Sequence, residues 1–205
     1  MSRPLRIAVL ASGKGSNLQA IIDAIESRKL NASIVLVISD KQDAYALQRA
    51  KEHKITYAFL DPKQPANKKE FEAKIAEKIK QQDVDLLVLA GWMRILGKTI
   101  LEVFKNRIIN IHPSLLPAFP GLDAQMQALE YGVKYTGCTV HFVDSGIDTG
   151  PIIAQRVVPV LQDDTVATLS ERILGEEHLL YPSVIQLFSE KKVYKEGRKV
   201  RIKED

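Results

Sequence analysis

Short runs of β-branched and apolar residues alternate with helix-like patterns along the first half of this 205-residue chain. Five runs are expected to form strands: 5–11, 33–39, 55–60, 84–90 and 107–112. Four intervening segments are expected to form helices: 16–28, 43–53, 67–82 and 97–105. Residues 84–90 are nearly all apolar, which is typical of a central strand covered on both faces. This order of elements predicts a doubly wound, mostly parallel α/β sheet with a Rossmann-like N-terminal half.

The alternation changes after residue 120. A helix at 121–131 is followed by two consecutive strands, 135–143 and 150–159, which predict an antiparallel pair. A helix should begin near residue 165, and Pro182 should break or kink it because proline has no N–H to donate. Residues 192–203 read as a hairpin. We therefore expect a single domain, 1–205, whose second half, 106–205, is mixed and partly antiparallel.

Composition is ordinary for a soluble globular protein and argues against several other classes. The chain is 45% hydrophobic and 26% charged, with a net charge of +4. The basic run at 191–203 is interpreted as a solvated surface, and no basic patch is interleaved with aromatic residues as nucleic-acid binding would require. The single cysteine, Cys138, is expected to be a buried core thiol, and four scattered histidines give no zinc signature. No run has the length of a signal-peptide core or a membrane span, so the cytoplasm is the expected location.

Residues 110–117, Asn-Ile-His-Pro-Ser-Leu-Leu-Pro, carry the strongest indication of chemistry. In an extended segment, residues two apart project to the same face, so Asn110 and His112 should project together from the end of a strand. An amide donor beside an imidazole suits a reaction that develops negative charge on a carbonyl oxygen. The alternative is structural, with Asn110 in a turn and His112 in the core. Their central strand, their shared face and the acidic loop that follows favour the catalytic interpretation.

The loop Val143–Pro151 offers two carboxylates as partners for the imidazole. Asp144 precedes Ser145-Gly146, a natural turn, so a structural role is expected for it. Asp148 is expected to be the partner, and its charge should raise the pKa of His112. His141 lies inside the preceding strand and is interpreted as a packed, hydrogen-bonded support residue.

Two further segments follow strand ends in the N-terminal half. Residues 11–17 contain Gly13 and Gly15 before a helix, which favours a phosphate site, although a plain strand-to-helix turn is the alternative. The loop lacks the Walker A spacing and the third glycine of a dinucleotide fingerprint. Residues 91–97 could cradle a flat ring, or could form a turn that buries Trp92; the residues alone leave both open.

Together these motifs resemble the folate-dependent formyltransferases, over essentially the whole chain. The resemblance rests on four ordered segments: 12–18, 90–96, 110–117 and 144–151. It implies transfer of a formyl group from 10-formyltetrahydrofolate to the amine of 5'-phosphoribosylglycinamide in purine biosynthesis, by direct attack and without a metal. Some family members carry histidines where this chain has Asp123 to Met126, a departure that leaves the catalytic set intact.

The resemblance also implies roles for individual residues. The catalytic residues would be Asn110, His112 and Asp148, and Glu177 would contact the glycinamide end. The substrate phosphate would be bound in the half spanning 1–105, by Lys14, Gly15, Ser16 and Asn17. The folate would be bound by Met93, Arg94, Ile95, Leu96, Asp144, Ser145, Gly146, Ile147 and Thr149.

Three rival interpretations change the acceptor or the class. A methionyl-tRNA formyltransferase would be expected to need a further C-terminal domain, and a formyltetrahydrofolate hydrolase an N-terminal regulatory domain. A nucleotide-binding regulatory module without catalysis would leave Asn110, His112 and Asp148 without a purpose. The expected partners are small molecules, with no nucleic acid and no membrane, and a homodimer is compatible with the resemblance.

Overall fold

The computed structural model describes residues 3–64 and 66–204. The chain divides into two compact units: unit 1 ends at Ile109 and unit 2 begins at Asn110. This boundary lies close to the predicted division after residue 105. In the described ranges, no helix has both the length and the apolar character that crossing a membrane requires.

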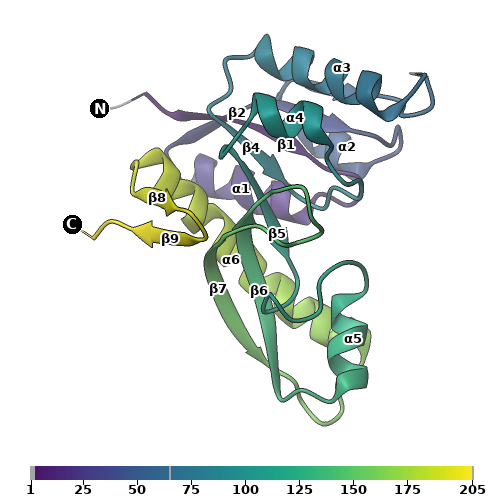
Figure 1. The fold of residues 1–205 in the computed structure, drawn as a ribbon, viewed down its shortest axis with the longest axis vertical. Coiled ribbons are helices and arrows are strands. Elements are labelled where there is room, and N and C mark those ends of the chain that lie inside the picture. Colours follow the sequence, from purple (N-terminus) through teal and green to yellow (C-terminus); the bar gives the residue numbers. More distant parts are fainter. Residues whose placement is uncertain (1–2, 65, 205) are drawn as a thin grey trace. The chain divides into compact units, whose positions relative to one another are not determined.

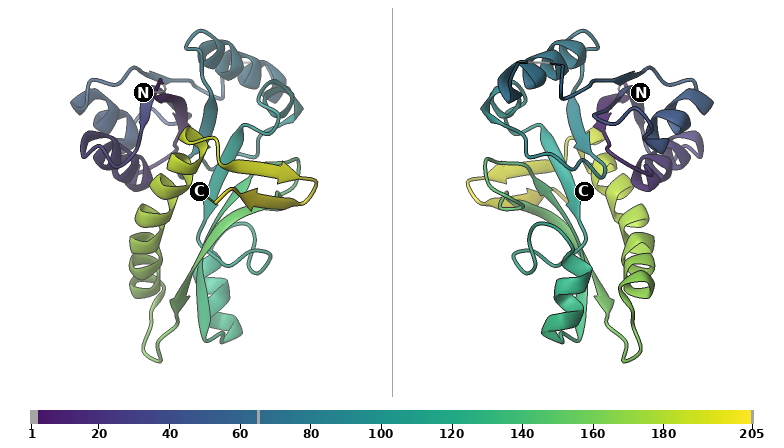
Figure 2. Two further views of the ribbon diagram at one scale, coloured as in Figure 1. Left: turned by 90° about the vertical axis from the view of Figure 1, so that its left-hand side faces the viewer. Right: turned by 90° about the vertical axis from the view of Figure 1, so that its right-hand side faces the viewer.

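Unit 1 is built on a parallel sheet with the strand order β3-β2-β1-β4. Its strands are β1 (Leu5–Leu10), β2 (Ala32–Ser39), β3 (Tyr57–Phe59) and β4 (Leu86–Leu89). Helices α1 (Ser16–Glu26) and α2 (Tyr45–Glu52) cover one face, and α3 (Lys68–Lys80) and α4 (Lys98–Val103) cover the other (Figures 1 and 2). All four residues of β4 are buried, as predicted for a strand covered on both faces. The doubly wound parallel arrangement is confirmed.

Helix α3 begins after Asn67, its N-cap residue. The Asn67 side chain accepts a hydrogen bond from the Glu70 N–H at 3.0 Å. The Glu70 carboxylate accepts from the N–H of Ala66 at 3.0 Å, one residue before the position that a capping box would use.

Unit 2 contains the mixed part of the fold. Strand β5 (Ile108–His112) spans the boundary between the units, and the order in unit 2 is β5-β6-β7. Strands β6 (Tyr135–Phe142) and β7 (Ile152–Pro159) are antiparallel, as predicted, and helix α6 (Val166–Ser189) packs along them (Figure 1). Helix α5 (Ala124–Tyr131) and the hairpin of β8 (Val193–Glu196) and β9 (Lys199–Ile202) complete the unit.

Of the two effects predicted for Pro182, a break or a kink of the last long helix, the break does not occur. Helix α6 runs through Pro182 for 24 residues. The residues around the proline, Leu180, Tyr181, Val184 and Ile185, are all buried. A proline inside a helix costs about 3 kcal/mol, and burying several large apolar side chains contributes about 1.5–3 kcal/mol each. Packing of this helix face therefore outweighs the missing hydrogen bond.

Candidate active site

Strand β5 brings Asn110 and His112 to its end, two residues apart as the alternation predicted. The side chain of His112 is buried and that of Asn110 is half-buried. Pro113 follows directly, where the strand ends. The amide and the imidazole are therefore fixed at a strand terminus, a position that holds side chains more rigidly than a loop does.

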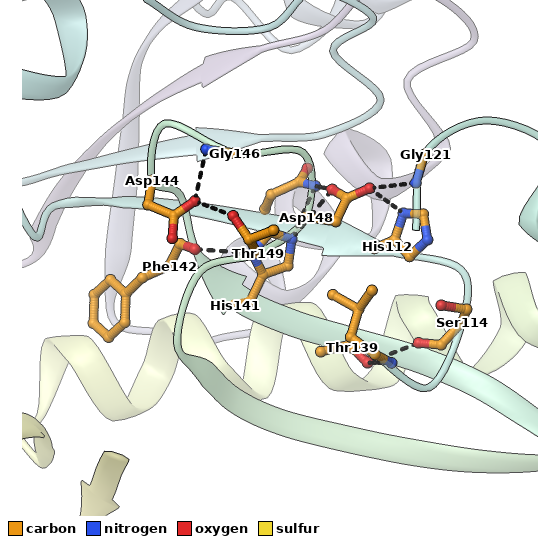
Figure 3. A network of polar contacts seen from close by, with 12 residues as sticks. His112, Ser114, Gly121, Thr139, His141, Phe142, Asp144, Gly146, Asp148 and Thr149 are labelled. Atoms are coloured by element: carbon orange, nitrogen blue, oxygen red, sulfur yellow. Dashed lines mark hydrogen bonds and ion pairs between the residues drawn. The ribbon is translucent and has the colours of Figure 1, made fainter. Parts of the chain in front are cut away.

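Asp148 joins the two strand residues into one polar group, and Figure 3 shows its carboxylate beside His112 and the Gly121 N–H. Its Oδ1 lies 3.5 Å from Asn110 Nδ2, and its Oδ2 lies 3.3 Å from His112 Nδ1. Oδ2 also accepts a hydrogen bond from the Gly121 N–H at 2.8 Å. The φ angle of Asp148 is 53°, in the left-handed region that a non-glycine residue adopts at a cost. The loop before β7 thus holds this carboxylate against both predicted partners.

The His112 ring has two contacts that favour different protonation states. Its Nε2 lies 2.8 Å from the Phe119 carbonyl oxygen, so Nε2 carries the proton that is donated there. Nδ1 then faces the Asp148 carboxylate, and only the doubly protonated ring donates to both acceptors. A proton taken up at Nδ1 would therefore lie between the ring and the carboxylate.

Burial decides the direction of the His112 pKa. Desolvation lowers this pKa below 6.5, and His141 adds to that effect, while the hydrogen bond to Phe119 and the charge of Asp148 act in the opposite direction. The expectation that Asp148 raises the pKa of His112 is thus correct for that one interaction. It is wrong for the net pKa of His112, because burial of the ring lowers this pKa by more than the charge of Asp148 raises it.

The pKa of Asp148 is lowered, although burial alone would raise it. Hydrogen bonds from His141 and from the Gly121 N–H, together with the charges of His112 and His141, outweigh the desolvation. Asp148 is therefore an ionised carboxylate at neutral pH, beside a ring that is ready to take a proton.

His141 holds the amide of Asn110. Its Nδ1 lies 2.8 Å from the Phe142 carbonyl oxygen, and its Nε2 lies 3.3 Å from Asn110 Nδ2 and 3.6 Å from Asp148 Oδ1. Nδ1 donates to the Phe142 carbonyl, while Nε2 faces both the Asn110 amide and the Asp148 carboxylate. The predicted support role of His141 agrees with this position.

The loop after β5 supplies groups that the sequence did not reveal. The backbone of Phe119 and Gly121 contacts His112 and Asp148, and backbone groups leave no trace in residue type. Thr139 fixes this loop: its hydroxyl donates to the Ser114 carbonyl at 2.7 Å and accepts from the Leu116 N–H at 3.1 Å (Figure 3). In the sequence, the only indication of this contact is Thr139 itself, a polar residue in an apolar strand. Its residue type does not identify the backbone groups that it binds.

The loop 144–149 is organised by Asp144. Its Oδ1 accepts from the Gly146 N–H at 3.0 Å and from the Thr149 hydroxyl at 2.6 Å. This is the structural role expected of Asp144, and it separates the two acidic residues: Asp148 faces the histidines and Asp144 closes the turn. Ile147 is exposed. Ser145 and Gly146 lie in the same turn, between Asp144 and Asp148, and both are exposed.

In unit 1, the predicted phosphate loop lines a pocket of about 300 Å³. Lys14, Gly15, Ser16 and Asn17 contribute to its wall, together with Lys41. Helix α1 begins here with no side-chain cap and no acidic residue in its first turn, so its N-terminal amides suit an anion. Gly15 has a φ of 67°, and a Cβ there would lie 2.8 Å from Ala46 Cβ. The glycine therefore permits close approach of α2, and its predicted contact with a phosphate stays a prediction.

The predicted folate segment 93–96 presents mixed surroundings. Met93 and Ile95 are exposed, whereas Leu96 and Trp92 are buried. The Met93 N–H donates to the Ser12 hydroxyl at 3.0 Å, which ties this segment to the phosphate loop. The segment therefore buries Trp92, as the turn interpretation expected, and its role in binding a flat ring stays a prediction.

Glu177 is buried within α6, close enough to Cys138 to influence its titration. Burial, and then the charges of Glu177 and Glu176, raise the pKa of the Cys138 thiol to about 12. Cys138 is fully buried, as predicted, and such a thiol is no nucleophile at neutral pH. Among residues 3–64 and 66–204, no cluster of histidine, cysteine and acidic side chains could hold a metal ion.

Comparison with known proteins places this geometry among formyl-transferring enzymes. Residues 5–185 match the profile of the formyl transferase family. A phosphoribosylglycinamide formyltransferase from Bacillus subtilis (strain 168) is 47% identical over 181 residues, covering 88% of this chain and 93% of the relative. A human trifunctional purine biosynthetic protein adenosine-3 is 46% identical over 89% of this chain, which spans only 18% of that protein.

Solved structures give the same result. A glycinamide ribonucleotide transformylase 1 from Symbiobacterium toebii is 51% identical, with a TM-score of 0.98 over 100% of this chain and 96% of that one. A formyltetrahydrofolate deformylase from Pseudomonas syringae is 28% identical, with a TM-score of 0.91 over 99% of this chain and 67% of that one. The fold is thus shared by proteins whose names state different reactions.

Proposed function

The chain belongs to the formyl transferase family, and from that premise we propose that it transfers a formyl group from 10-formyltetrahydrofolate to the amine of 5'-phosphoribosylglycinamide, a step of purine biosynthesis. The observation that carries this proposal is the polar group of Asn110, His112 and Asp148, with separations of 3.3–3.5 Å from the carboxylate. It combines an amide donor, a titratable ring and a base in one place. The relatives named as phosphoribosylglycinamide formyltransferases support the choice of acceptor.

The reaction is a direct attack of the amine on the formyl carbon. An α-amino group has a pKa of about 8, so the amine is partly neutral near neutral pH and needs no strong base to attack. Cys138 is buried with a raised pKa, which supports a pathway without a covalent enzyme intermediate. The oxygen of the formyl group becomes an oxyanion in the tetrahedral intermediate, and Asn110 Nδ2 and the His112 ring stabilise it.

The proton released by the amine passes to the Asp148–His112 pair. In the resting site Nδ1 of His112 faces Asp148 Oδ2 at 3.3 Å, and the ring is neutral because burial lowers its pKa. Negative charge on the nearby oxyanion raises the affinity of the ring for a proton. Protonation at Nδ1 then creates an imidazolium–carboxylate pair at the moment when the oxyanion forms. The same proton is later delivered to the leaving nitrogen of the folate.

The remaining predicted residues are assigned to the two substrates. Lys14, Gly15, Ser16 and Asn17 bind the phosphate of the acceptor, supported by the pocket that they line at the start of α1. Glu177 contacts the glycinamide end. The exposed side chains of Met93 and Ile95 support a role in binding the flat folate ring, together with the rest of the segment 93–96 and the loop 144–149.

The proposed reaction takes formyl folate as a co-substrate and uses no metal in any step. We place it in the cytoplasm, the location expected from the sequence. The homodimer stays a prediction.

The experiment that tests the function measures tetrahydrofolate formation from 10-formyltetrahydrofolate, with and without phosphoribosylglycinamide. We expect turnover only when the ribonucleotide is present. Turnover without it would show water as the acceptor, the reaction that the similarity to a formyltetrahydrofolate deformylase makes the second candidate. No turnover in either mixture would contradict both enzymatic assignments.

A further inference from the structure

The C-terminal hairpin contacts the loop that carries Asp148. Figure 2 shows β8 and β9 (yellow) as a two-stranded ribbon that follows α6. The turn between these strands contains Gly197, with a φ of 60°, and then Arg198. Arg198 Nη1 donates a hydrogen bond to the carbonyl oxygen of Thr149, the residue directly after Asp148.

Thr149 is held through its side chain and through its backbone. The Thr149 hydroxyl donates to Asp144 Oδ1 at 2.6 Å, and its carbonyl accepts from Arg198. The Phe142 N–H donates to the Pro151 carbonyl at 2.9 Å, which closes the two ends of the loop. The hydroxyl and the carbonyl of Thr149 are therefore both hydrogen-bonded, one residue after the catalytic Asp148.

The hairpin makes a second contact at the other end of the loop. Lys195 Nζ lies 5.9 Å from the centroid of the Phe142 ring, at the end of β6 where the loop begins. Arg198 and Lys195 thus approach the loop at residues on either side of 143–148. The basic run, interpreted from sequence as a solvated surface, has at least two members with specific partners.

We propose that Arg198 is a positioning residue, which acts on formyl transfer by holding the Thr149 carbonyl and thereby the left-handed backbone of Asp148. Asp148 keeps a φ of 53° only while its neighbours fix it. Its Oδ1 and Oδ2 must reach Asn110, His112 and the Gly121 N–H together. A guanidinium on the following carbonyl restricts rotation of that peptide. This inference rests on the proposed function for its kinetic consequences, but not for its structural ones.

The same hairpin offers a matched control. Arg201 Nε pairs with Glu196 Oε2 at 2.9 Å, and both residues belong to the hairpin itself. Arg201→Ala removes the same charge from the same ribbon, and the ion pair that it breaks lies within the hairpin. Arg198→Lys keeps a cationic donor of similar reach, so it should rescue part of the effect of Arg198→Ala.

The experiment measures two quantities for the wild type and for these three variants. The first is amide hydrogen exchange of the loop 143–150, read by mass spectrometry. The second is kcat and KM for formyl transfer to phosphoribosylglycinamide. For Arg198→Ala we expect faster exchange in the loop and a kcat lowered about three- to tenfold, the range that one net hydrogen bond supports. The Arg201→Ala variant should match the wild type in loop exchange and in kcat. Arg198→Lys should give values between those of the wild type and of Arg198→Ala.

A purely structural role would give a different pattern. Equal losses of thermal stability and equal exchange in Arg198→Ala and Arg201→Ala, with kcat unchanged, would overturn the proposal. If the wild type itself transfers no formyl group, the proposed function fails, and hydrogen exchange alone still decides whether Arg198 holds the loop.

Discussion

His112 lies between a carbonyl and a carboxylate, and its protonation state links structure to chemistry. Burial lowers its pKa below 6.5, while the pair with Asp148 provides a place for an added proton at Nδ1. A ring permanently charged at rest would already be paired with Asp148 before the oxyanion forms. A ring that becomes charged during the reaction interacts more strongly with the oxyanion in the transition state than with the substrate at rest. Only an interaction of this kind accelerates the chemical step.

The lowered pKa of His112 predicts how stability depends on pH. Below pH 6.5 the unfolded chain binds a proton at this ring, whereas the folded chain does so only at lower pH. The free energy of unfolding should therefore fall as the pH decreases from 6.5 toward the folded-state pKa. Urea unfolding at pH 7.5, 6.5 and 5.5 checks this, with His112→Gln expected to show a shallower decrease.

The opposite slope would contradict this account of His112. If Asp148 held the ring in its charged form, stability would rise as the pH falls through 6.5. Asp148 itself has a lowered pKa, so its contribution is lost only below about pH 3.8, outside this window. The two groups can thus be separated by the pH range measured.

Residue-scale predictions from the sequence succeeded where the signal is a periodicity. The spacing of Asn110 and His112 predicted that they share a strand end, and turn chemistry separated Asp144 from Asp148. The carbonyl of Phe119 and the N–H of Gly121 were not predictable, because any residue type supplies them. The net direction of the His112 pKa also required the structure, since it depends on burial of the ring.

At the scale of elements, the glycine loop before α1 combines a structural requirement with a proposed binding role. Gly15 has a φ of 67°, and Ala46 of α2 fills the space that a side chain would need. Ser16 and Asn17 line the pocket at the start of the helix. The structural requirement falls on Gly15 alone, whereas Ser16 contributes a side-chain hydroxyl, so substitutions can separate the two roles.

Gly15→Ala should lower the free energy of unfolding by about 1–2 kcal/mol, the cost of a left-handed residue with a Cβ, and by more where Ala46 must move. Ser16→Ala should keep the stability of the wild type and raise KM for phosphoribosylglycinamide about fivefold, through loss of one hydrogen bond. Urea unfolding and steady-state kinetics on both variants check this. Unchanged KM in Ser16→Ala would argue against a phosphate-binding role of its hydroxyl.

Element boundaries were predicted best where strands are short and apolar, and worst where a local rule competes with packing. The alternation of strands and helices predicted the parallel sheet of unit 1. The rule that proline ends a helix failed at Pro182, because the buried face of α6 contributes more than one lost hydrogen bond costs. Local propensity gave no measure of that burial.

For the whole molecule, the two units divide the predicted residues between them. Unit 1 contains the glycine loop and the segment 93–96, and unit 2 contains Asn110, His112, Asp148 and Glu177. The formyl transferase family match covers residues 5–185, so it includes both sets. Because a deformylase shares this fold, the fold identifies the chemistry of the formyl group more firmly than its acceptor.

The most direct measurement compares Asp148→Asn with the wild type in single-turnover formyl transfer, alongside the affinity for phosphoribosylglycinamide. The change removes the carboxylate charge beside His112 and Asn110 and keeps the side-chain size. We predict a rate lowered at least about 100-fold, as for loss of a general acid–base group, with substrate affinity unchanged because the phosphate site is elsewhere in the chain. A rate within about threefold of the wild type would show that Asp148 does not move the proton, and would contradict the proposed mechanism at its central step.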